Sequence, residues 1–343
     1  MKPVANKAPQ IWILSRGRKG DLDQMLALAR AVGWPFEVKH LRFAGPDIPV
    51  LARLLLKDRA ALCAPWPDLV FCAEASPSVI AMHIKRLSNG RTRAVCIGRP
   101  AGAARDFDLV LTTAQYRIPA APHVIDLSMP IAAESEALST QAQPDGPIAM
   151  IVGGPAFPDQ LDAAAAAQLA ADALAYAMRR NKRLVVHTSP RTPPEVAAAL
   201  ARVIAAPHQL HVFGQGPNRY RELLAEASEI AVTSDSVSMT SDALAAGKPV
   251  SIYRLPMRDS FKLRLGDWLY RNAVEAPRPG LAPVRWLFDA GMIEAAADRR
   301  RLFARLVAEK RAAWFGEALP APQPQAASKD LAHAVHSLRA LMA

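Results

Sequence analysis

The sequence predicts an α/β protein made of two doubly wound, Rossmann-like domains that face a shared cleft. Two observations lead to this fold class. Short, fully apolar strand-like segments alternate with helix-like segments, and the alternation stops at residues 131–147 and then restarts. Apolar strands that alternate with helices are typical of parallel sheets covered on both faces. The 343 residues also fit two domains, since a domain usually contains about 100–200 residues.

The first expected domain covers residues 1–130. Its first strand, at 10–14, is followed by a loop rich in glycine and arginine and then by a helix at 21–32, where apolar residues recur with helical spacing. A further helix is expected at 78–87. The other apolar segments predict strands at 36–41, 68–72, 93–97, 109–112 and 123–127.

Residues 131–147 are small, polar and prone to turns, and are therefore expected to form a linker. The second domain, 148–317, repeats the pattern, with strands at 148–152, 183–188, 210–213, 229–233 and 249–253 and helices at 160–180, 194–205, 220–227 and 238–246. A basic amphipathic helix is expected at 294–315, either as part of the core or as a face for anionic lipid. A Pro-rich hinge and a last helix near 331–341 occupy residues 318–343.

The charge of the chain is uneven. Its net charge is +11, and residues 1–130 carry 18 Lys and Arg against 10 Asp and Glu, a surplus of +8. A basic half attracts anions such as phosphorylated substrates or an acidic membrane surface, although a basic surface can also serve solubility alone. Nucleic acid is not expected as a partner, because aromatic residues make up only 6% and no stacking motif is interleaved with the basic residues.

Compartment and redox state can also be anticipated. No apolar run approaches the roughly 20 residues of a membrane span, and no signal-peptide core precedes the first strand. We therefore expect a cytoplasmic protein, with peripheral binding at the inner membrane face as an option. Cys63, Cys72 and Cys96 are widely spaced and are expected to be reduced thiols, not a disulfide framework or a zinc site.

Functional residues are expected in loops just after strands, because doubly wound domains bind ligands outside the carboxyl ends of their strands. In the first domain, the loop after the first strand opens a helix and contains two glycines and three cations. A helix N-terminus attracts anions, so this loop predicts an acceptor or anion site that also includes Arg99, after the fourth strand. Its residues are Ser15, Arg16, Arg18, Lys19 and Arg99.

Two carboxylates of the first domain are candidate general bases. Asp21 lies at the start of the first helix, where it could instead be the helix N-cap. Glu74 follows the third strand and could equally be a surface residue. Either carboxylate could take a proton from an attacking hydroxyl group.

In the second domain, loops after several strands predict a site for a nucleotide diphosphate. The segment 233–243 has eight hydroxyl or carboxyl side chains in eleven positions, more than the capping of one helix requires. An arginine in the loop 187–193 is suited to forked phosphate contacts, and glycines after two strands allow close approach of the backbone. The expected donor-binding residues are Gly153, Gly154, Arg191, Gly214, Gly216, Asn218, Ser234, Asp235, Ser236, Ser238 and Asp242.

The segment TSDSVSMTSDALAAGKPV resembles the donor-binding segment of GT-B glycosyltransferases. Six further segments carry a narrower resemblance: SRGRKGDLDQMLALARAVG, IGRP, FDLVLTT, GGP, TSPRTP and FGQGPNRY. With them, residues 11–255 resemble the mitochondrial-fission ELM protein family, whose bacterial members are often labelled nucleoside-diphosphate-sugar epimerases. The resemblance implies a GT-B-like fold in which the hydroxyl-rich turn meets the diphosphate and a helix carboxylate meets the ribose or sugar.

The redox-epimerase activity can be tested on the sequence. Such enzymes need a Tyr-x-x-x-Lys pair and a G-x-x-G-x-x-G loop for NAD, but no lysine follows any of the five tyrosines at that spacing, and SRGRKGD lacks the glycine pattern. Metal-ligand and Walker motifs are also absent from the sequence. We therefore expect neither a cofactor nor a metal.

Two functions remain open. The first is a metal-independent glycosyltransferase that uses a nucleotide sugar, with a lipid-linked or phosphorylated glycan as acceptor. The second is a non-catalytic module of transferase fold that recruits partners to a membrane surface, through the basic helix and the basic first domain. The expected partners are a nucleotide sugar and either anionic lipid or a lipid-linked acceptor.

Overall fold

The computed structural model describes residues 8–44, 49–57, 59–131, 143–258, 260–322 and 326–343. The chain forms two compact units. Unit 1 consists of Met1–Ala133, Lys262–Asp298 and Ser328–Ala343, and unit 2 of Glu134–Phe261 and Arg299–Ala327. Most of the expected linker at 131–147 lies outside the described residues.

Unit 1 contains a six-stranded parallel sheet in the order β2-β1-β3-β4-β5-β6. Its strands are β1 (Ile11–Ser15), β2 (Phe36–His40), β3 (Leu69–Glu74), β4 (Arg93–Pro100), β5 (Leu109–Thr113) and β6 (Val124–Leu127). Its helices are α1 (Lys19–Val32), α2 (Ala52–Leu55), α3 (Ala75–Leu87), α8 (Phe261–Tyr270), α9 (Ala282–Asp289) and α11 (Ala326–Met342).

Side-chain alternation along the strands of unit 1 builds two cores. Ile13 and Phe71 point to one face, where they pack with α1 and α11, while Leu14 and Cys72 point to the other, where they pack with α2 and α3. Successive residues of a strand alternate between faces, so burial on both faces requires the continuous apolar strands seen in the sequence. After β1 the chain continues into a helix on one face of the sheet, and after β3 it continues into a helix on the other face. The position between these neighbouring strands is therefore the topological switch point.

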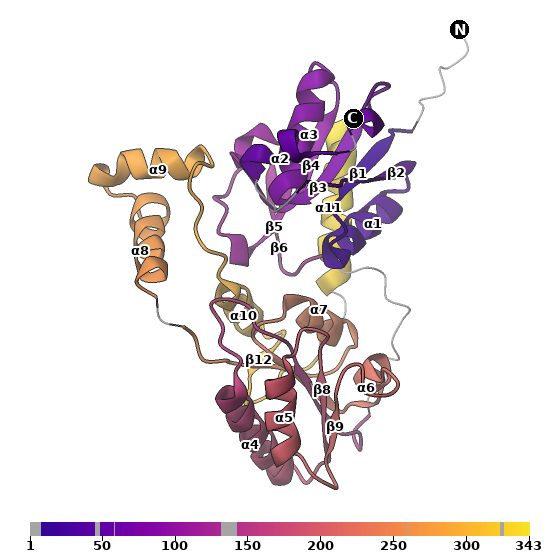
Figure 1. Ribbon diagram of the computed structural model, residues 1–343, viewed down its shortest axis with the longest axis vertical. Coiled ribbons are helices and arrows are strands. Elements are labelled where there is room, and N and C mark those ends of the chain that lie inside the picture. Colours follow the sequence, from indigo (N-terminus) through magenta and orange to yellow (C-terminus); the bar gives the residue numbers. More distant parts are fainter. Residues whose placement is uncertain (1–7, 45–48, 58, 132–142, 259, 323–325) are drawn as a thin grey trace. The chain divides into compact units, whose positions relative to one another are not determined.

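Unit 2 contains a second six-stranded parallel sheet, in the order β12-β11-β10-β7-β8-β9. Its strands are β7 (Ile148–Val152), β8 (Leu184–Thr188), β9 (Gln209–His211), β10 (Glu229–Thr233), β11 (Val250–Tyr253) and β12 (Ala313–Trp314). Its helices are α4 (Ala163–Arg179), α5 (Pro194–Val203), α6 (Tyr220–Glu226), α7 (Val237–Ala245) and α10 (Arg299–Ala308). The switch point lies between β7 and β10, and α4 and α5 pack together on one face (Figure 1).

The predicted class of two doubly wound parallel sheets is confirmed, but one predicted element is wrong. The helix expected at 294–315 is only Arg299–Ala308, and Ala313 pairs with Ser251 as part of the edge strand β12. Lys310, in a left-handed conformation at φ 54°, separates the two. Leu302, Phe303 and Leu306 of α10 are fully buried, so its apolar face belongs to the core and is not presented to lipid.

The unit boundaries differ from those expected, because two segments after residue 261 pack on unit 1. Arg117 pairs with Asp267 and Glu275, which attaches the 262–298 segment. Asp330 accepts a hydrogen bond from the Ser128 amide at 3.0 Å, and Leu338 of α11 is buried against the first sheet. Within the described part of the chain, no helix is long and apolar enough to cross a membrane.

Candidate functional site

The switch point of unit 1 brings Asp21 and Glu74 together. Both carboxylates line two small cavities of about 10 and 30 Å³ at the carboxyl ends of β1 and β3. Asp21 comes from the first turn of α1, and Glu74 is the last residue of β3. The two candidate bases, separated by 53 positions in the sequence, therefore share one site.

Glu74 is held in an unusual conformation. Its φ of 33° is positive, which is uncommon for a residue other than glycine and points to local strain. The Tyr116 hydroxyl donates a hydrogen bond to Glu74 Oε1. Gly98, at φ 88°, faces the carboxylate: a Cβ there would lie 2.7 Å from Glu74 Oε1. Glycine at position 98 and tyrosine at 116 together fix this carboxyl group.

Burial raises the pKa values of both carboxyl groups. For Asp21, burial is the main cause and nearby Arg18 partly opposes it. For Glu74, burial is again the main cause; the hydrogen bond from Tyr116 lowers the pKa, and the charge of Asp21 raises it. Carboxyl groups with raised pKa values at a switch point are candidates for proton transfer near neutral pH.

The loop between β1 and α1 departs in part from the expected anion site. The N-cap of α1 is Arg18, whose side chain makes no capping hydrogen bond. The alternative role of Asp21 as the helix N-cap is therefore wrong. Ser15 is buried, and its hydroxyl accepts a hydrogen bond from the Gly17 amide at 3.1 Å, which shapes the turn. The Arg16 guanidinium lies 4.9 Å from the centre of the Phe43 ring. Lys19 is the first residue of α1.

Arg99 does not present its guanidinium to this loop. It donates hydrogen bonds to the backbone carbonyls of Tyr116 and Ala295 and lies 3.7 Å from Glu294. Burial lowers its pKa. Arg99 therefore attaches the 262–298 segment to β4 and lines a separate pocket of unit 1.

The switch point of unit 2 is closed by hydrogen bonds between the loops after β7 and β10. The Gly153 amide donates to Thr233 Oγ1 at 2.9 Å, and the Gly154 amide donates to Asp235 Oδ2 at 2.8 Å. A Cβ on Gly153 would overlap the Asp235 carboxylate, and one on Gly154 would overlap the Arg191 backbone. Both glycines are thus required by the protein's own packing.

Arg191 and Asp235 link the β8 and β10 loops at this point. The Arg191 guanidinium is about half exposed and lies 3.6 Å from the fully buried Asp235 carboxylate. Burial raises the pKa of Asp235, while hydrogen bonds from Thr233 and Gly154 and the charge of Arg191 lower it. Asp235 therefore positions an exposed cation at the edge of the sheet.

The serines that follow β10 have different roles. Ser234 is buried, donates to Asp159 at 3.4 Å and accepts a hydrogen bond from the Leu255 amide at 3.1 Å. Ser236 is buried as the N-cap of α7, and its hydroxyl accepts from the Met239 amide at 3.5 Å. Ser238 is exposed in the first turn of that helix. Of the three, Ser238 alone is exposed.

Tyr220 connects the remaining predicted residues. Its hydroxyl donates to Asp242 at 3.0 Å, and its amide donates to Asn218 Oδ1 at 3.1 Å. Gly214 and Gly216 form an exposed turn at φ 81° and 87°, a conformation that favours glycine. The β9 loop is thereby tied to α7 through a tyrosine that the sequence interpretation did not select.

Three functional candidates were missed: Gly98, Tyr116 and Tyr220. Gly98 lies near the end of β4, Tyr116 ends the turn after β5, and Tyr220 is the first residue of α6, so position near a strand end or a loop was the available signal. Gly98 faces Glu74 from 24 positions away, and the hydrogen-bond partners of Tyr116 and Tyr220 lie 42 and 22 positions away; such contacts cannot be inferred from one sequence. Among the described residues, no group of three His, Cys, Asp or Glu side chains could hold a metal ion.

The fold and the two switch points define a doubly wound two-unit α/β protein with polar side chains gathered at the carboxyl edge of each sheet. The chain belongs to the mitochondrial fission ELM1 family, whose model matches residues 19–275. The family that the sequence resembles is thereby confirmed. Comparison with the curated proteins finds no match.

Solved structures of low sequence identity resemble the chain over nearly its whole length. A protein described as UDP-N-acetylglucosamine 2-epimerase from Listeria monocytogenes is 10% identical, with 97% of each chain covered and a TM-score of 0.49. The UDP-GlcNAc 2-epimerase from Neisseria meningitidis bound to UDP-GlcNAc is 12% identical, covering 95% of this chain and 99% of its own, with a TM-score of 0.45. MurG from Acinetobacter baumannii is 14% identical, with the same coverages and a TM-score of 0.44.

Proposed function

We propose that this protein is a metal-independent glycosyltransferase whose donor is a nucleotide sugar. The observation that carries the proposal is the exposed Arg191 guanidinium, fixed by buried Asp235 beside the N-terminus of α7. The amides of a first helical turn lack partners within the helix and carry partial positive charge. A guanidinium and a helix N-terminus at a switch point form a site suited to a diphosphate.

The expected chemistry divides between the units. Unit 2 binds the donor, with the diphosphate on Arg191 and the start of α7, and with Asp242 and Asn218 placed for ribose or sugar hydroxyls. Unit 1 binds the acceptor, a lipid-linked or phosphorylated glycan, and supplies Asp21 or Glu74 as general base. The acceptor oxygen attacks the anomeric carbon, the carboxylate takes the hydroxyl proton, and the bond to the diphosphate breaks.

The positive charge of unit 2 stabilises the leaving group in this scheme. As the glycosidic bond breaks, negative charge grows on the nucleoside diphosphate, and Arg191 with the α7 amides lies where that charge develops. This arrangement supplies the electrostatic role that a divalent ion has in metal-dependent transferases.

Calorimetric titration with UDP-, GDP-, ADP- and CMP-sugars tests the proposal. We expect one class of nucleotide to bind, and Arg191→Ala to weaken binding about tenfold or more, because a charge-assisted phosphate contact is lost. Arg202→Ala, an exposed arginine on α5 of the same unit, is the matched control and should bind as the wild type does. Absence of binding to every nucleotide, or equal binding by Arg191→Ala, would contradict the proposal. Vesicle binding without nucleotide binding would instead favour the non-catalytic recruitment module.

A further inference from the structure

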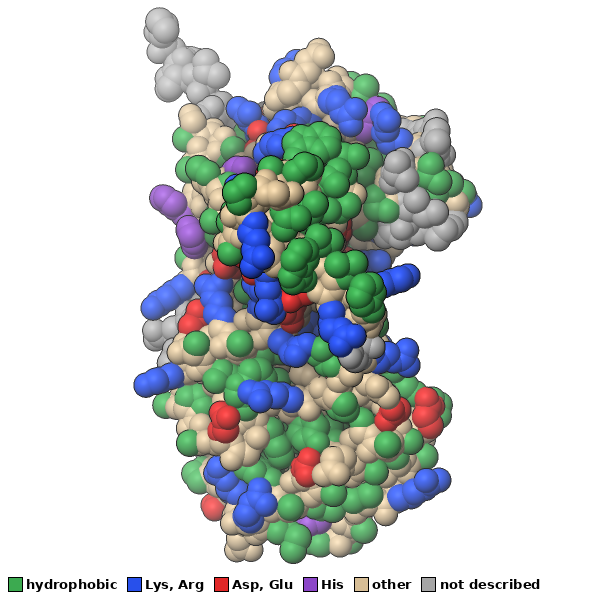
Figure 2. Space-filling model, turned by 90° about the vertical axis from the view of Figure 1, so that its left-hand side faces the viewer, with side chains coloured by type: hydrophobic (Ala, Val, Ile, Leu, Met, Phe, Trp, Pro, Cys, Tyr) green, Lys and Arg blue, Asp and Glu red, His purple; other side chains and the backbone are tan. Residues whose placement is uncertain are grey.

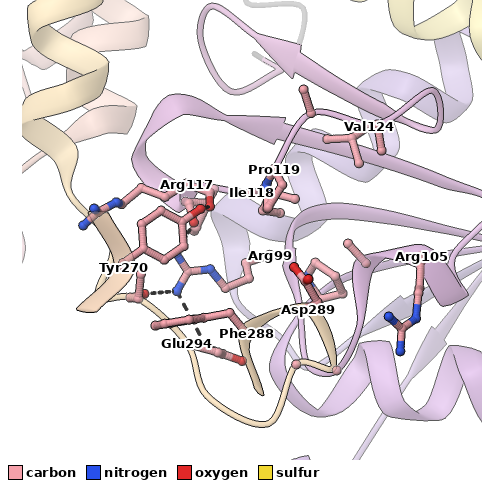
Figure 3. Close-up of a pocket in the computed structure, with 18 of the residues that line it drawn as sticks. Arg99, Arg105, Arg117, Ile118, Pro119, Val124, Tyr270, Phe288, Asp289 and Glu294 are labelled. Atoms are coloured by element: carbon pink, nitrogen blue, oxygen red, sulfur yellow. Dashed lines mark hydrogen bonds and ion pairs between the residues drawn. The ribbon is translucent and has the colours of Figure 1, made fainter. Parts of the chain in front are cut away.

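Unit 1 contains a pocket of about 250 Å³ outside the Asp21–Glu74 site. Three chain segments form it: 99–105 after β4, 116–124 between β5 and β6, and 270–295 around α9 (Figure 3). The backbones approach closely at one point, where a Cβ on Gly291 would lie 2.1 Å from the carbonyl carbon of Gly102. The 262–298 segment thus creates a pocket that the strands and loops of the sheet would not form alone.

The walls of this pocket are mainly apolar. Figure 3 shows Ile118, Pro119 and Val124 on one side and Phe288 on the other. The Phe288 ring packs edge-on against Tyr270, with 5.2 Å between ring centres. A concave site with apolar walls and few polar groups is suited to the apolar part of a ligand.

The buried Arg117 and the half-buried Arg99 of the pocket already have partners in the protein. Arg117 lies 2.6 Å from Asp267 and 3.5 Å from Glu275, and its guanidinium lies 4.3 Å from the centre of the Tyr270 ring. Arg99 is bound to two backbone carbonyls and to Glu294. Their charge is therefore largely compensated, and the pocket interior does not favour a small polyanion over an apolar group.

Tyr116 connects this pocket to the candidate base. It lines the 250 Å³ pocket and also the cavity that contains Asp21 and Glu74, and its hydroxyl binds Glu74. A ligand that fills the pocket would thus reach Tyr116, whose hydroxyl contacts Glu74.

The outer surface of the same segment is apolar and basic. Leu265, Trp268, Trp286 and Met292 are 42%, 49%, 58% and 64% exposed, four large apolar side chains within 28 positions. Figure 2, which turns this side toward the viewer, shows hydrophobic side chains gathered there with Lys and Arg beside them. The exposed cations of the segment are Lys262, Arg264, Arg271, Arg278 and Arg285. Tryptophan with basic residues around it is typical of surfaces that bind anionic lipid.

We propose that this pocket binds the hydrocarbon chain of an amphiphilic acceptor that carries an anionic head group, drawn from a membrane surface that the α8–α9 segment contacts. The apolar walls hold the chain, the acceptor hydroxyl lies toward Tyr116, and the anionic group lies toward the exposed cations of the α8–α9 segment. The assignment of the ligand as acceptor rests on the proposed transferase function, whereas chain binding in the pocket does not.

Titration with dodecyl phosphate, dodecanol and inorganic phosphate tests chain binding. We expect saturable binding of dodecyl phosphate and no measurable binding of inorganic phosphate, since the chain supplies the affinity. Ala120→Trp, which fills the pocket from an exposed lining position, should weaken binding about tenfold. Phe288→Ala, which removes one wall, provides a second variant and should also weaken binding. Ala201→Trp on exposed α5 of unit 2 is the control and should leave binding unchanged.

Vesicle sedimentation tests the source of the chain. The protein should bind vesicles of phosphatidylglycerol and phosphatidylcholine more strongly than phosphatidylcholine alone, and Trp268→Ala with Trp286→Ala should reduce this binding while dodecyl phosphate still binds. The inference would be overturned if inorganic phosphate bound as tightly as dodecyl phosphate, or if Ala120→Trp kept the wild-type affinity for dodecyl phosphate. Self-association through α8 and α9 without vesicle binding would also overturn it. Titration of the wild-type protein separates the two proposals: absence of nucleotide binding contradicts the transferase, and absence of alkyl-chain binding alone contradicts only the pocket.

Discussion

Glu74 is a carboxylate whose environment is set by a few neighbours. Tyr116 donates a hydrogen bond to it, Gly98 leaves room for it, and Asp21 faces it from α1. The first contact stabilises the ionised form and the last opposes it. The pKa of Glu74 can therefore be moved in either direction by changing one neighbour.

Substituting the neighbours of Glu74 should shift its titration in opposite directions. Tyr116→Phe removes a hydrogen bond to the carboxylate, so the pKa of Glu74 should rise further; Asp21→Asn removes a like charge, so it should fall. Carbon-detected NMR titration of the glutamate carboxyl groups measures both shifts without requiring activity. Shifts of the same sign in the two variants would refute this account of the site.

The raised pKa of Glu74 also has a consequence for stability. A carboxyl group whose pKa is higher in the folded state stabilises folding at low pH, and this contribution is lost as the pH rises through the folded-state pKa. The unfolding free energy of the wild-type protein should therefore fall between acid and neutral pH, and that of Glu74→Gln should fall less. Urea unfolding at a series of pH values measures this change, with Glu195→Gln, at an exposed glutamate of α5, as the control.

At the scale of elements, the start of α7 shows how a hydroxyl-rich turn is divided between structure and binding. Ser234, Asp235 and Ser236 are buried and serve the protein's own contacts, whereas Ser238 is exposed. The sequence predicted the turn and its position after β10. It could not separate these roles, because burial depends on the β7 and β8 loops, which arrive from about 45 to 80 positions away.

Removing the cap of α7 should lower stability and weaken donor binding together. Ser236→Ala should cost about 0.5–2 kcal/mol of unfolding free energy, because the Met239 amide loses its acceptor. Ser238→Ala should leave stability nearly unchanged and affect nucleotide binding alone. Urea unfolding combined with nucleotide titration distinguishes the two serines; equal loss of stability in both variants would argue against the assigned roles.

At the scale of the whole molecule, unit 1 is completed by its most distant segment. Ala334 and Leu338 of α11 are fully buried against the same sheet face as α1. The sequence predicted a helix near 331–341, since its apolar spacing is local information. It did not predict which sheet the helix covers, because every doubly wound sheet offers apolar faces and the choice depends on contacts such as Asp330 with Ser128.

Truncating one side chain of α11 should destabilise unit 1 selectively. Leu338→Ala should lower its unfolding free energy by about 2–5 kcal/mol, since a buried leucine leaves a cavity. His336→Ala, at an exposed position of the same helix, is the control. Hydrogen exchange resolved by segment should show faster exchange in β1 and β3 and unchanged exchange in β7 and β10; uniform acceleration throughout the chain would contradict the assignment of α11 to unit 1.

The order in which segments contribute to the units has a consequence for biosynthesis. Unit 1 draws on Met1–Ala133, Lys262–Asp298 and Ser328–Ala343, and unit 2 on Glu134–Phe261 and Arg299–Ala327. While the chain is being translated, the first sheet leaves the ribosome long before α11, which covers part of one of its faces. Unit 2 gains its edge strand β12 earlier than unit 1 gains α11, so the half of the protein that is synthesised first is the half that finishes folding last.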